Sequence, residues 1–328
     1  MPTAHANMLG LPIYVTDSGT NDLVNTGGNF MSDGLGNAFA SELILEENEA
    51  GNPYGVTVKT EADIDKRLAE LFITRFRLGL FDPPSMNPYN DIPEDVVNSE
   101  AHAEIAYEAA AKSLVLLKNN GALPLSSEIR TLYVVGPQAN NSEVLIGNYY
   151  GMSKSLVNVL EGITSRVSSG TTINYKQGVL DYRDNINPMD WTTGEAKAAD
   201  ACIAVMGISS LLEGEEGESI ASPSKGDRLD LNLPSNQMDF LRKLKEDSEH
   251  PLIVVMTGGS PITMPELDEL ADAIIWAWYP GQEGGNSVVD VLSGQVNPSG
   301  KLAISFPLKY EDSPTAKNFP GHAVKQEG

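Results

Sequence analysis

The 328-residue sequence has little of what several classes of functional site require. Its single cysteine, Cys202, excludes an internal disulfide and any metal site built from several cysteines. The 4 histidines are scattered without His-x-x-x-His spacing, which argues against a zinc enzyme. No run of roughly 18 apolar residues is present to span a bilayer. The first residues lack the basic start and apolar run of a secretory signal peptide, so localisation stays open.

Positive charge is also scarce. Only 22 Lys and Arg residues stand against 45 Asp and Glu, which gives a net charge of −23 at pH 7. Binding to nucleic-acid backbones or anionic membranes requires dense Lys and Arg, so we expect neither partner. Hydrophobic residues make up 41% of the chain, which is enough for a sizeable core. We therefore expect a folded protein of one large domain or two ordinary ones.

The second half of the chain alternates short apolar runs with segments of helical periodicity. Several runs are apolar on both faces, which is typical of strands covered by helices on each side. The alternation predicts an α/β fold with an open, largely parallel sheet sandwiched by helices. The expected strands are 113–117, 131–135, 172–175, 201–206, 252–256, 273–278 and 302–305. The expected helices are 155–167, 234–246 and 284–293.

The first hundred residues read differently. Residues 12–16 are a strand candidate, and residues 60–77 predict a helix with Thr60 as its N-cap. The segment 83–100 begins with a dense set of prolines, which indicates a semi-rigid linker.

Carboxylates cluster after one of the expected strands. Glu213, Glu215 and Glu216 follow the strand at 201–206 and belong to a loop at the carboxyl edge of the sheet, where ligands bind in such folds. Crowded carboxylates suit general acid catalysis because their mutual repulsion favours a protonated form. The alternative is a solvated acidic loop. Asp17 also ends a strand candidate, and its alternative role is a turn or helix cap. Two opposed carboxylates are what glycoside hydrolysis requires.

Several aromatic residues could contact a sugar, since a ring suits the C–H-rich side of a pyranose. Tyr149 and Tyr150 lie in an expected loop, and Trp278 ends the strand at 273–278. For each of them ordinary packing is the alternative, and Trp276 is expected in the core. The neighbouring Asp227 and Arg228 predict a loop ion pair.

A series of short stretches then gives a resemblance. The chain resembles the family 3 glycoside hydrolases, especially the bacterial β-xylosidase and β-glucosidase branch. The matching stretches run in family order and include RFRLGLFDP (75–83), SLVLLKN (113–119), VVGP (134–137), GNYYG (147–151), GISSLLEGEE (207–216), WYPGQEGG (278–285) and NPSGKL (297–302).

The resemblance implies an N-terminal (β/α)8-like barrel followed by an α/β sandwich, and often a fibronectin-like domain. It implies an Asp nucleophile in the barrel, matched by Asp17 in VTDSGT, and a Glu acid/base on a sandwich loop. Glu213 is the candidate, with Glu215 and Glu216 as fallbacks. A whole barrel needs roughly 200–250 residues, so we expect 1–82 to be an incomplete barrel remnant. The sandwich is expected over 101–310, with a truncated tail at 311–328.

The function implied by the resemblance is retaining hydrolysis of β-linked oligosaccharides or glycosides, with release of terminal xylose or glucose. This scheme requires no metal and no organic cofactor. With most of the barrel absent, we expect the chain to lack full activity unless a missing barrel half or a second copy completes it. Family members are often periplasmic or secreted. The alternative is a non-catalytic α/β module that binds a carbohydrate or a partner.

Overall fold

A computed structural model of the chain describes residues 30–32, 38–40, 61–148, 151, 153–214, 219–313 and 316. The chain divides into two compact units, residues 1–93 and 94–328, and each is described by itself. Within the described ranges, no helix has both the length and the apolar character needed to cross a membrane.

In the described part of the first unit, a short strand pair and one long helix are present. β1 (Phe30–Ser32) pairs with β2 (Ala38–Ala40) in antiparallel fashion. α3 (Glu61–Arg77) confirms the helix predicted over residues 60–77. The expected proline-rich linker contains the one-turn 3-10 helices η1 (Pro84–Met86) and η2 (Pro88–Asp91). Each begins at a proline, whose fixed φ suits a first helical position.

The second unit is built on a six-stranded sheet with the order β3-β8-β7-β6-β4-β5. Its strands are β3 (Val115–Asn119), β4 (Thr131–Val135), β5 (Thr172–Lys176), β6 (Ala201–Gly207), β7 (Leu252–Thr257) and β8 (Ala273–Trp278). Neighbouring strands are parallel except β3, which runs antiparallel to β8. The predicted largely parallel α/β fold is confirmed.

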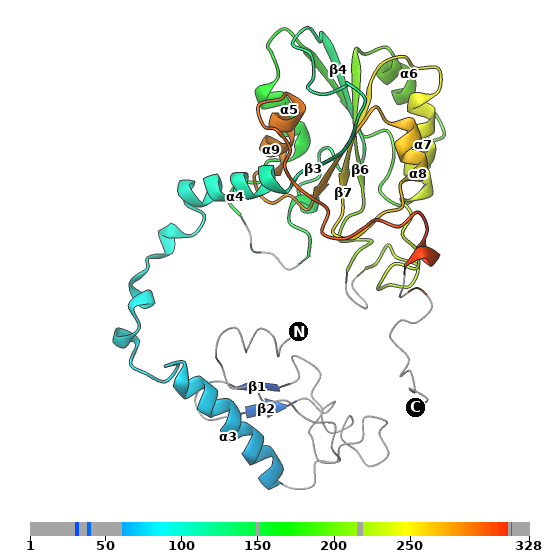
Figure 1. The fold of residues 1–328 in the computed structure, drawn as a ribbon. Helices are drawn as coiled ribbons and strands as arrows, with labels where there is room; N and C mark the ends of the chain where they lie inside the picture. The colour runs from blue at the N-terminus through cyan, green and yellow to red at the C-terminus, as the bar shows by residue number, and fades with distance from the viewer. Residues whose placement is uncertain are drawn as a thin grey trace, which may run out of the picture. The chain divides into compact units, whose positions relative to one another are not determined.

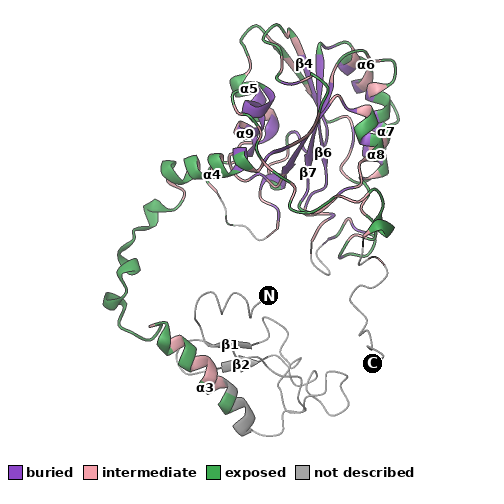
Figure 2. Cartoon of the chain, viewed as in Figure 1, coloured by how far each residue is buried: buried purple, intermediate pink, exposed green. Residues whose placement is uncertain are grey.

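Helices cover both faces of this sheet (Figure 1). One face carries α4 (Glu100–Ser113), α5 (Val159–Arg166) and α9 (Gly284–Leu292), and the other carries α6 (Thr192–Lys197), α7 (Ser235–Lys245) and α8 (Pro265–Leu270). The one-turn helices are η3 (Glu94–Val96), η4 (Glu143–Leu145) and η5 (Tyr310–Asp312). Because the central strands β6 and β7 are covered on both sides, every residue in them is buried (Figure 2).

One predicted strand is wrong. Residues 302–305 form an irregular segment. Leu302 and Phe306 pack against the core, whereas Ile304 is 58% exposed. The apolar run in the sequence therefore reflects single side chains that reach the core, and none of the described strands pairs with the segment.

Two glycines allow α5 and α9 to approach each other closely. A Cβ at Gly162 would lie 2.2 Å from the carbonyl oxygen of Gly285, and a Cβ at Gly285 would lie 1.9 Å from the carbonyl oxygen of Asn158. Asn158 is the N-cap of α5, and it forms a reciprocal capping box with Glu161. The contact fixes the start of α9 and with it the segment that joins β8 to α9.

We expect Gly285→Ala to lower the free energy of unfolding by about 2 kcal/mol or more, because the added methyl meets backbone atoms that cannot move aside. The matched control is Gly194→Ala in α6, where an added Cβ would have no heavy atom within 4 Å. It should be neutral, or stabilising by up to about 1 kcal/mol. Urea unfolding followed by circular dichroism measures both, and equal effects would contradict the close-approach argument.

Candidate functional site

Three parallel strands end at the same edge of the sheet and bring a small polar cluster together. β6 pairs with β7, and β7 pairs with β8, in parallel, and the β7–β8 register shifts once, between Met256 and Thr257. Glu213 lies in the turn that follows β6, Gly259 in the turn after β7, and Tyr279 directly after β8. The predicted placement of the Glu213 loop at the carboxyl edge therefore agrees with the structure.

Glu213 is held through both its backbone and its side chain. Its N–H donates to the carbonyl oxygen of Ser209 at 3.0 Å. Its own carbonyl oxygen accepts from Nδ2 of Asn148 at 2.8 Å. In the side chain, Oε2 accepts from the hydroxyl of Tyr279 at 2.6 Å and from the N–H of Gly259 at 2.8 Å. No described residue hydrogen bonds with Oε1. One carboxylate oxygen is thus held by two donors, and the other has no hydrogen bond with a described residue.

The Tyr279 ring fits into this cluster because two neighbours have no side chain. A Cβ at Gly147 would lie 2.9 Å from the ring, and a Cβ at Gly259 would lie 3.1 Å from it. Gly147 also has a φ of +63°, which favours glycine. The ring and its hydroxyl are therefore positioned by backbone packing from two separate loops.

The half-buried Arg228 supports the loop after β7 through its guanidinium. Nη2 of Arg228 donates to Oγ of Ser260 at 2.7 Å and to the carbonyl oxygen of Pro261 at 2.8 Å. Nη1 is buried with no hydrogen-bond partner among the described residues. Burial lowers the pKa of Arg228, and the negative charge of Glu213 opposes that shift. Arg228 thus places a positive charge near Glu213.

The predicted ion pair between Asp227 and Arg228 is wrong. The guanidinium is turned to the loop after β7, and it makes both of its hydrogen bonds there. Adjacency in sequence did not predict the partner of Arg228, because its long side chain reaches the loop after β7 and donates to a carbonyl group there.

A half-buried carboxylate, Asp181, supports the start of the Glu213 turn. Asp181 accepts from Oγ of Ser209 at 2.7 Å and from Nε2 of Gln138 at 2.8 Å. Burial raises the pKa of Asp181, and these two hydrogen bonds oppose the rise. Gln237 donates to the backbone carbonyl of Asp181 at 2.6 Å and bonds with both backbone groups of Gly207. This network fixes the chain between the end of β6 and Ser209.

The other sequence candidates fall into two groups. The indole N–H of Trp278 donates to the carbonyl oxygen of Ser113 at 3.1 Å, and its ring packs edge-to-face against Trp276 at 5.7 Å. Trp276 is buried, as predicted. A sugar contact by Trp278 stays a prediction. The candidates Asp17, Tyr149, Tyr150, Glu215 and Glu216 lie outside the described residues.

The sequence of this unit matches a known domain. Residues 114–327 correspond to the glycosyl hydrolase family 3 C-terminal domain. The chain belongs to glycoside hydrolase family 3. The resemblance seen in the short stretches is thereby confirmed.

Curated family 3 relatives include β-xylosidases of fungi and plants. The chain is 34% identical over 256 residues to the exo-1,4-beta-xylosidase xlnD of Emericella nidulans and covers 30% of its length. It is 35% identical over 279 residues to beta-D-xylosidase 3 of Arabidopsis thaliana and covers 34% of its length. These alignments include 77% and 82% of this chain. The chain therefore spans about a third of the length of the curated relatives it matches.

Solved family 3 structures share the fold. A GH3 exo-beta-xylosidase (XlnD) in complex with a xylobiose aziridine probe is 34% identical, with a TM-score of 0.63 over 74% of this chain and 30% of that one. A mutant beta-glucosidase from Listeria innocua in complex with laminaribiose is 26% identical, with the same TM-score of 0.63 over 76% of this chain and 33% of its own.

Sequence reasoning found Glu213 but missed the groups that hold it. Tyr279 follows β8 directly and Gly259 follows the last residue of β7 by two positions. That placement was the available signal, because parallel strands bring such residues to one edge. Asn148 and Asp181 carry no comparable signal. Their roles depend on loops that only the folded chain brings to the Glu213 turn.

Burial raises the pKa of Tyr279 well above its usual value of about 10, and the negative charge of Glu213 adds to the rise. We expect the phenol to stay a hydrogen-bond donor in the folded protein when the pH passes 10. In an alkaline titration followed by phenolate absorbance, Tyr279→Phe should leave the amplitude of the folded protein unchanged up to about pH 11. In urea, where all 11 tyrosines titrate, the variant should lose one of them.

The same shift sets a pH dependence of stability. The raised pKa contributes stability that is fully present below the unfolded value of about 10 and is lost as the pH rises above it. In the phenolate titrations, an equal loss of amplitude for Tyr279→Phe in the folded and the urea-unfolded protein would contradict the placement of the Tyr279 hydroxyl on Glu213.

Proposed function

We propose that this chain provides the acid/base side of a retaining β-glycosidase that releases terminal xylose or glucose from β-linked oligosaccharides. The observation that carries the proposal is the one-sided anchoring of Glu213, whose Oε2 is held by Tyr279 and Gly259. The β-xylosidases and β-glucosidases among the relatives support the class of reaction.

In the proposed reaction, Asp17 attacks the anomeric carbon while Oε1 of Glu213 gives its proton to the departing glycosidic oxygen. The bond from carbon to that oxygen breaks, and a glycosyl–Asp17 ester remains. Glu213 then takes a proton from water as the water oxygen attacks the anomeric carbon, and the ester bond to Asp17 breaks. Retention requires the two carboxyl groups to lie about 5–5.5 Å apart. The scheme uses no metal and no organic cofactor.

The described contacts suit this role. Tyr279 and Gly259 hold Glu213 in one orientation, so that Oε1 returns to the same place in both steps. The charge of Arg228 favours the carboxylate that forms when the proton leaves. The network of Asp181 and Ser209 holds the turn on which Glu213 lies.

The remaining parts of the proposal concern the other wall of the pocket. We assign Asp17 to a barrel remnant in residues 1–82, with a linker at 83–100, the sandwich at 101–310 and a tail at 311–328. Tyr149, Tyr150 and Trp278 are proposed to contact the sugar. A barrel half on another chain, or a second copy of this chain, would complete the site.

A non-catalytic module that binds a carbohydrate or a partner is the second candidate. One observation favours it: the hydrogen bonds of Glu213 with described residues are made within its own unit, so the same carboxylate could serve to hold the loop.

The first test is turnover of nitrophenyl β-xyloside and β-glucoside by the chain and by Glu213→Gln. An amide can act neither as the general acid nor as the general base. Because nitrophenolate departs with little protonation, the loss should arise mainly when water attacks the glycosyl–Asp17 ester, and we expect the rate to fall by about 10²- to 10⁴-fold. Glu215→Gln and Glu216→Gln are matched controls from the same loop and should change the rate by less than about tenfold.

A larger loss with Glu215→Gln or Glu216→Gln would transfer the acid role to that residue. Absence of turnover by the unsubstituted chain, together with saturable sugar binding, would overturn the enzyme and support the module.

The second test concerns the nucleophile. A 2-deoxy-2-fluoro-β-xyloside with a good leaving group should accumulate as a glycosyl–enzyme. The fluorine slows both formation and hydrolysis of the ester, and the good leaving group restores only the rate of formation. Peptide mass spectrometry should find the added sugar on the peptide that contains Asp17, and Asp17→Ala should abolish the label. A label on another carboxylate would show that Asp17 is not the nucleophile.

A further inference from the structure

Large apolar side chains lie exposed along one stretch of the first unit, which runs from the last turns of α3 through η1 and η2 (Figure 2). We call residues 73–92 the apolar segment. Every residue from 81 to 92 is exposed. The most exposed large apolar side chains of the segment, at 63–74%, are Phe76, Leu78, Leu80, Met86 and Tyr89.

The first part of the apolar segment is packed onto the end of α3. The ring of Phe81 contacts the rings of Phe76 and Phe72, with centroids 4.4 Å and 5.7 Å apart. The N–H of Leu80 donates to the carbonyl oxygen of Arg75 at 3.1 Å, so the chain turns back at the helix end. Phe76 therefore has an aromatic neighbour on one side and stays 65% exposed on the other.

The second part of the apolar segment is held by its own polar side chains. Asn87 accepts from the N–H of Tyr89 at 3.0 Å and caps η2. Nδ2 of Asn90 donates to the carbonyl oxygen of Pro84 at 2.8 Å and so joins η2 to η1. Met86 and Tyr89 thus extend from a locally ordered backbone. Covering them requires little further ordering, which favours association.

The exposed area of the apolar segment fits a protein partner. A large apolar residue has roughly 200 Å² of surface, so the five side chains at 63–74% leave on the order of 700 Å² uncovered. Ile73 and Ile92, at 50% and 55%, add to this area. A monomer rarely exposes a contiguous apolar patch larger than a few hundred Å². One partner in a stable complex buries about 800 Å².

The charges of the apolar segment favour a second copy of this chain as that partner. The segment contains two basic and two acidic residues and has no net charge, whereas the whole chain carries −23. Arg75 and Arg77 lie at its start, in the last turn of α3, and Asp82 and Asp91 follow. An antiparallel contact between two copies brings the basic start of each segment to the acidic end of the other. A partner of a single charge sign would match only half of it.

We propose that residues 73–92 form the contact between two copies of this chain in a symmetric dimer. The apolar side chains of both segments cover one another, and the charged residues lie around them. Because both copies use the same surface, the contact closes at two copies and leaves no segment free. The proposal does not depend on the proposed hydrolysis.

The test is analytical ultracentrifugation of the full chain between 1 and about 100 μM. We expect a monomer–dimer equilibrium with a Kd on the order of 1 μM, as suits an interface of this size. Met86→Glu and Tyr89→Glu should each raise the Kd by about tenfold or more, because each substitution buries a charge twice in the dimer. Ile186→Glu is the matched control: Ile186 is 92% exposed and lies in the second unit, so the Kd should not change.

Hydrogen exchange locates the contact independently. Peptides from residues 73–92 should exchange more slowly at 100 μM than at 1 μM, and Met86→Glu should remove the difference. The proposal is overturned by a monomer throughout the range, by species larger than a dimer, or by equal effects of Tyr89→Glu and Ile186→Glu. A dimer in which exchange over 73–92 does not change would also overturn it, since another surface would then form the contact. Circular dichroism verifies the fold of each variant.

Discussion

The parallel pairing of β6, β7 and β8 is the constraint on which the site depends. In an open parallel sheet all carboxyl ends lie at one edge, so residues far apart in sequence meet there. Glu213 and Tyr279 are 66 positions apart and Glu213 and Gly259 are 46 apart, yet both pairs form hydrogen bonds. Bringing these loops together costs little conformational entropy because the buried strands already fix the ends of the loops. A shift in strand order would separate all three residues at once.

The strands themselves could be predicted because burial on two faces leaves a signal in the sequence. β6 and β7 are continuous apolar runs, and their bounds agree with the prediction to within one residue. The direction of β3 left no such signal, since antiparallel and parallel edge strands share one local pattern. α6 and α8 have six residues each, too few for a helical period to emerge. Residues 302–305 show the converse error, in which an apolar run occurs without strand pairing.

The acidic residue of the candidate site could be predicted from the sequence, but the groups that hydrogen bond with it could not. A carboxylate after a buried strand is visible in the sequence, whereas the donors that hold it come from three other loops. Those donors offset a general cost: in a chain of net charge −23, each carboxylate at a crowded edge is repelled by the rest. The Tyr279 hydroxyl, the Gly259 N–H and the Arg228 charge supply local attraction. These short-range attractions outweigh the repulsion from distant carboxylates, because salt screens charges that lie more than about 10 Å apart.

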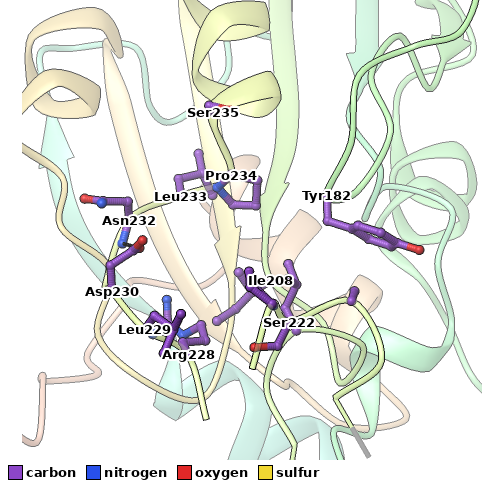
Figure 3. Close-up of a pocket in the computed structure, with 13 residues that line it drawn as sticks. Tyr182, Ile208, Ser222, Arg228, Leu229, Asp230, Asn232, Leu233, Pro234 and Ser235 are labelled. Carbon is purple, nitrogen blue, oxygen red and sulfur yellow. Dashed lines mark hydrogen bonds between the residues drawn. The ribbon is translucent and has the colours of Figure 1, made fainter. Parts of the chain in front are cut away.

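The segment between β6 and α7 has two faces with different chemistry. One face presents Glu213 to Tyr279 and Gly259, and the other lines a cavity of about 410 Å³ through Ile208 and Leu212 (Figure 3). Ser209, between Ile208 and Leu212 in the sequence, is held by a hydrogen bond to Asp181. Leu212 directly precedes Glu213, so a single peptide unit joins a side chain that lines the cavity to the residue that bears the carboxylate.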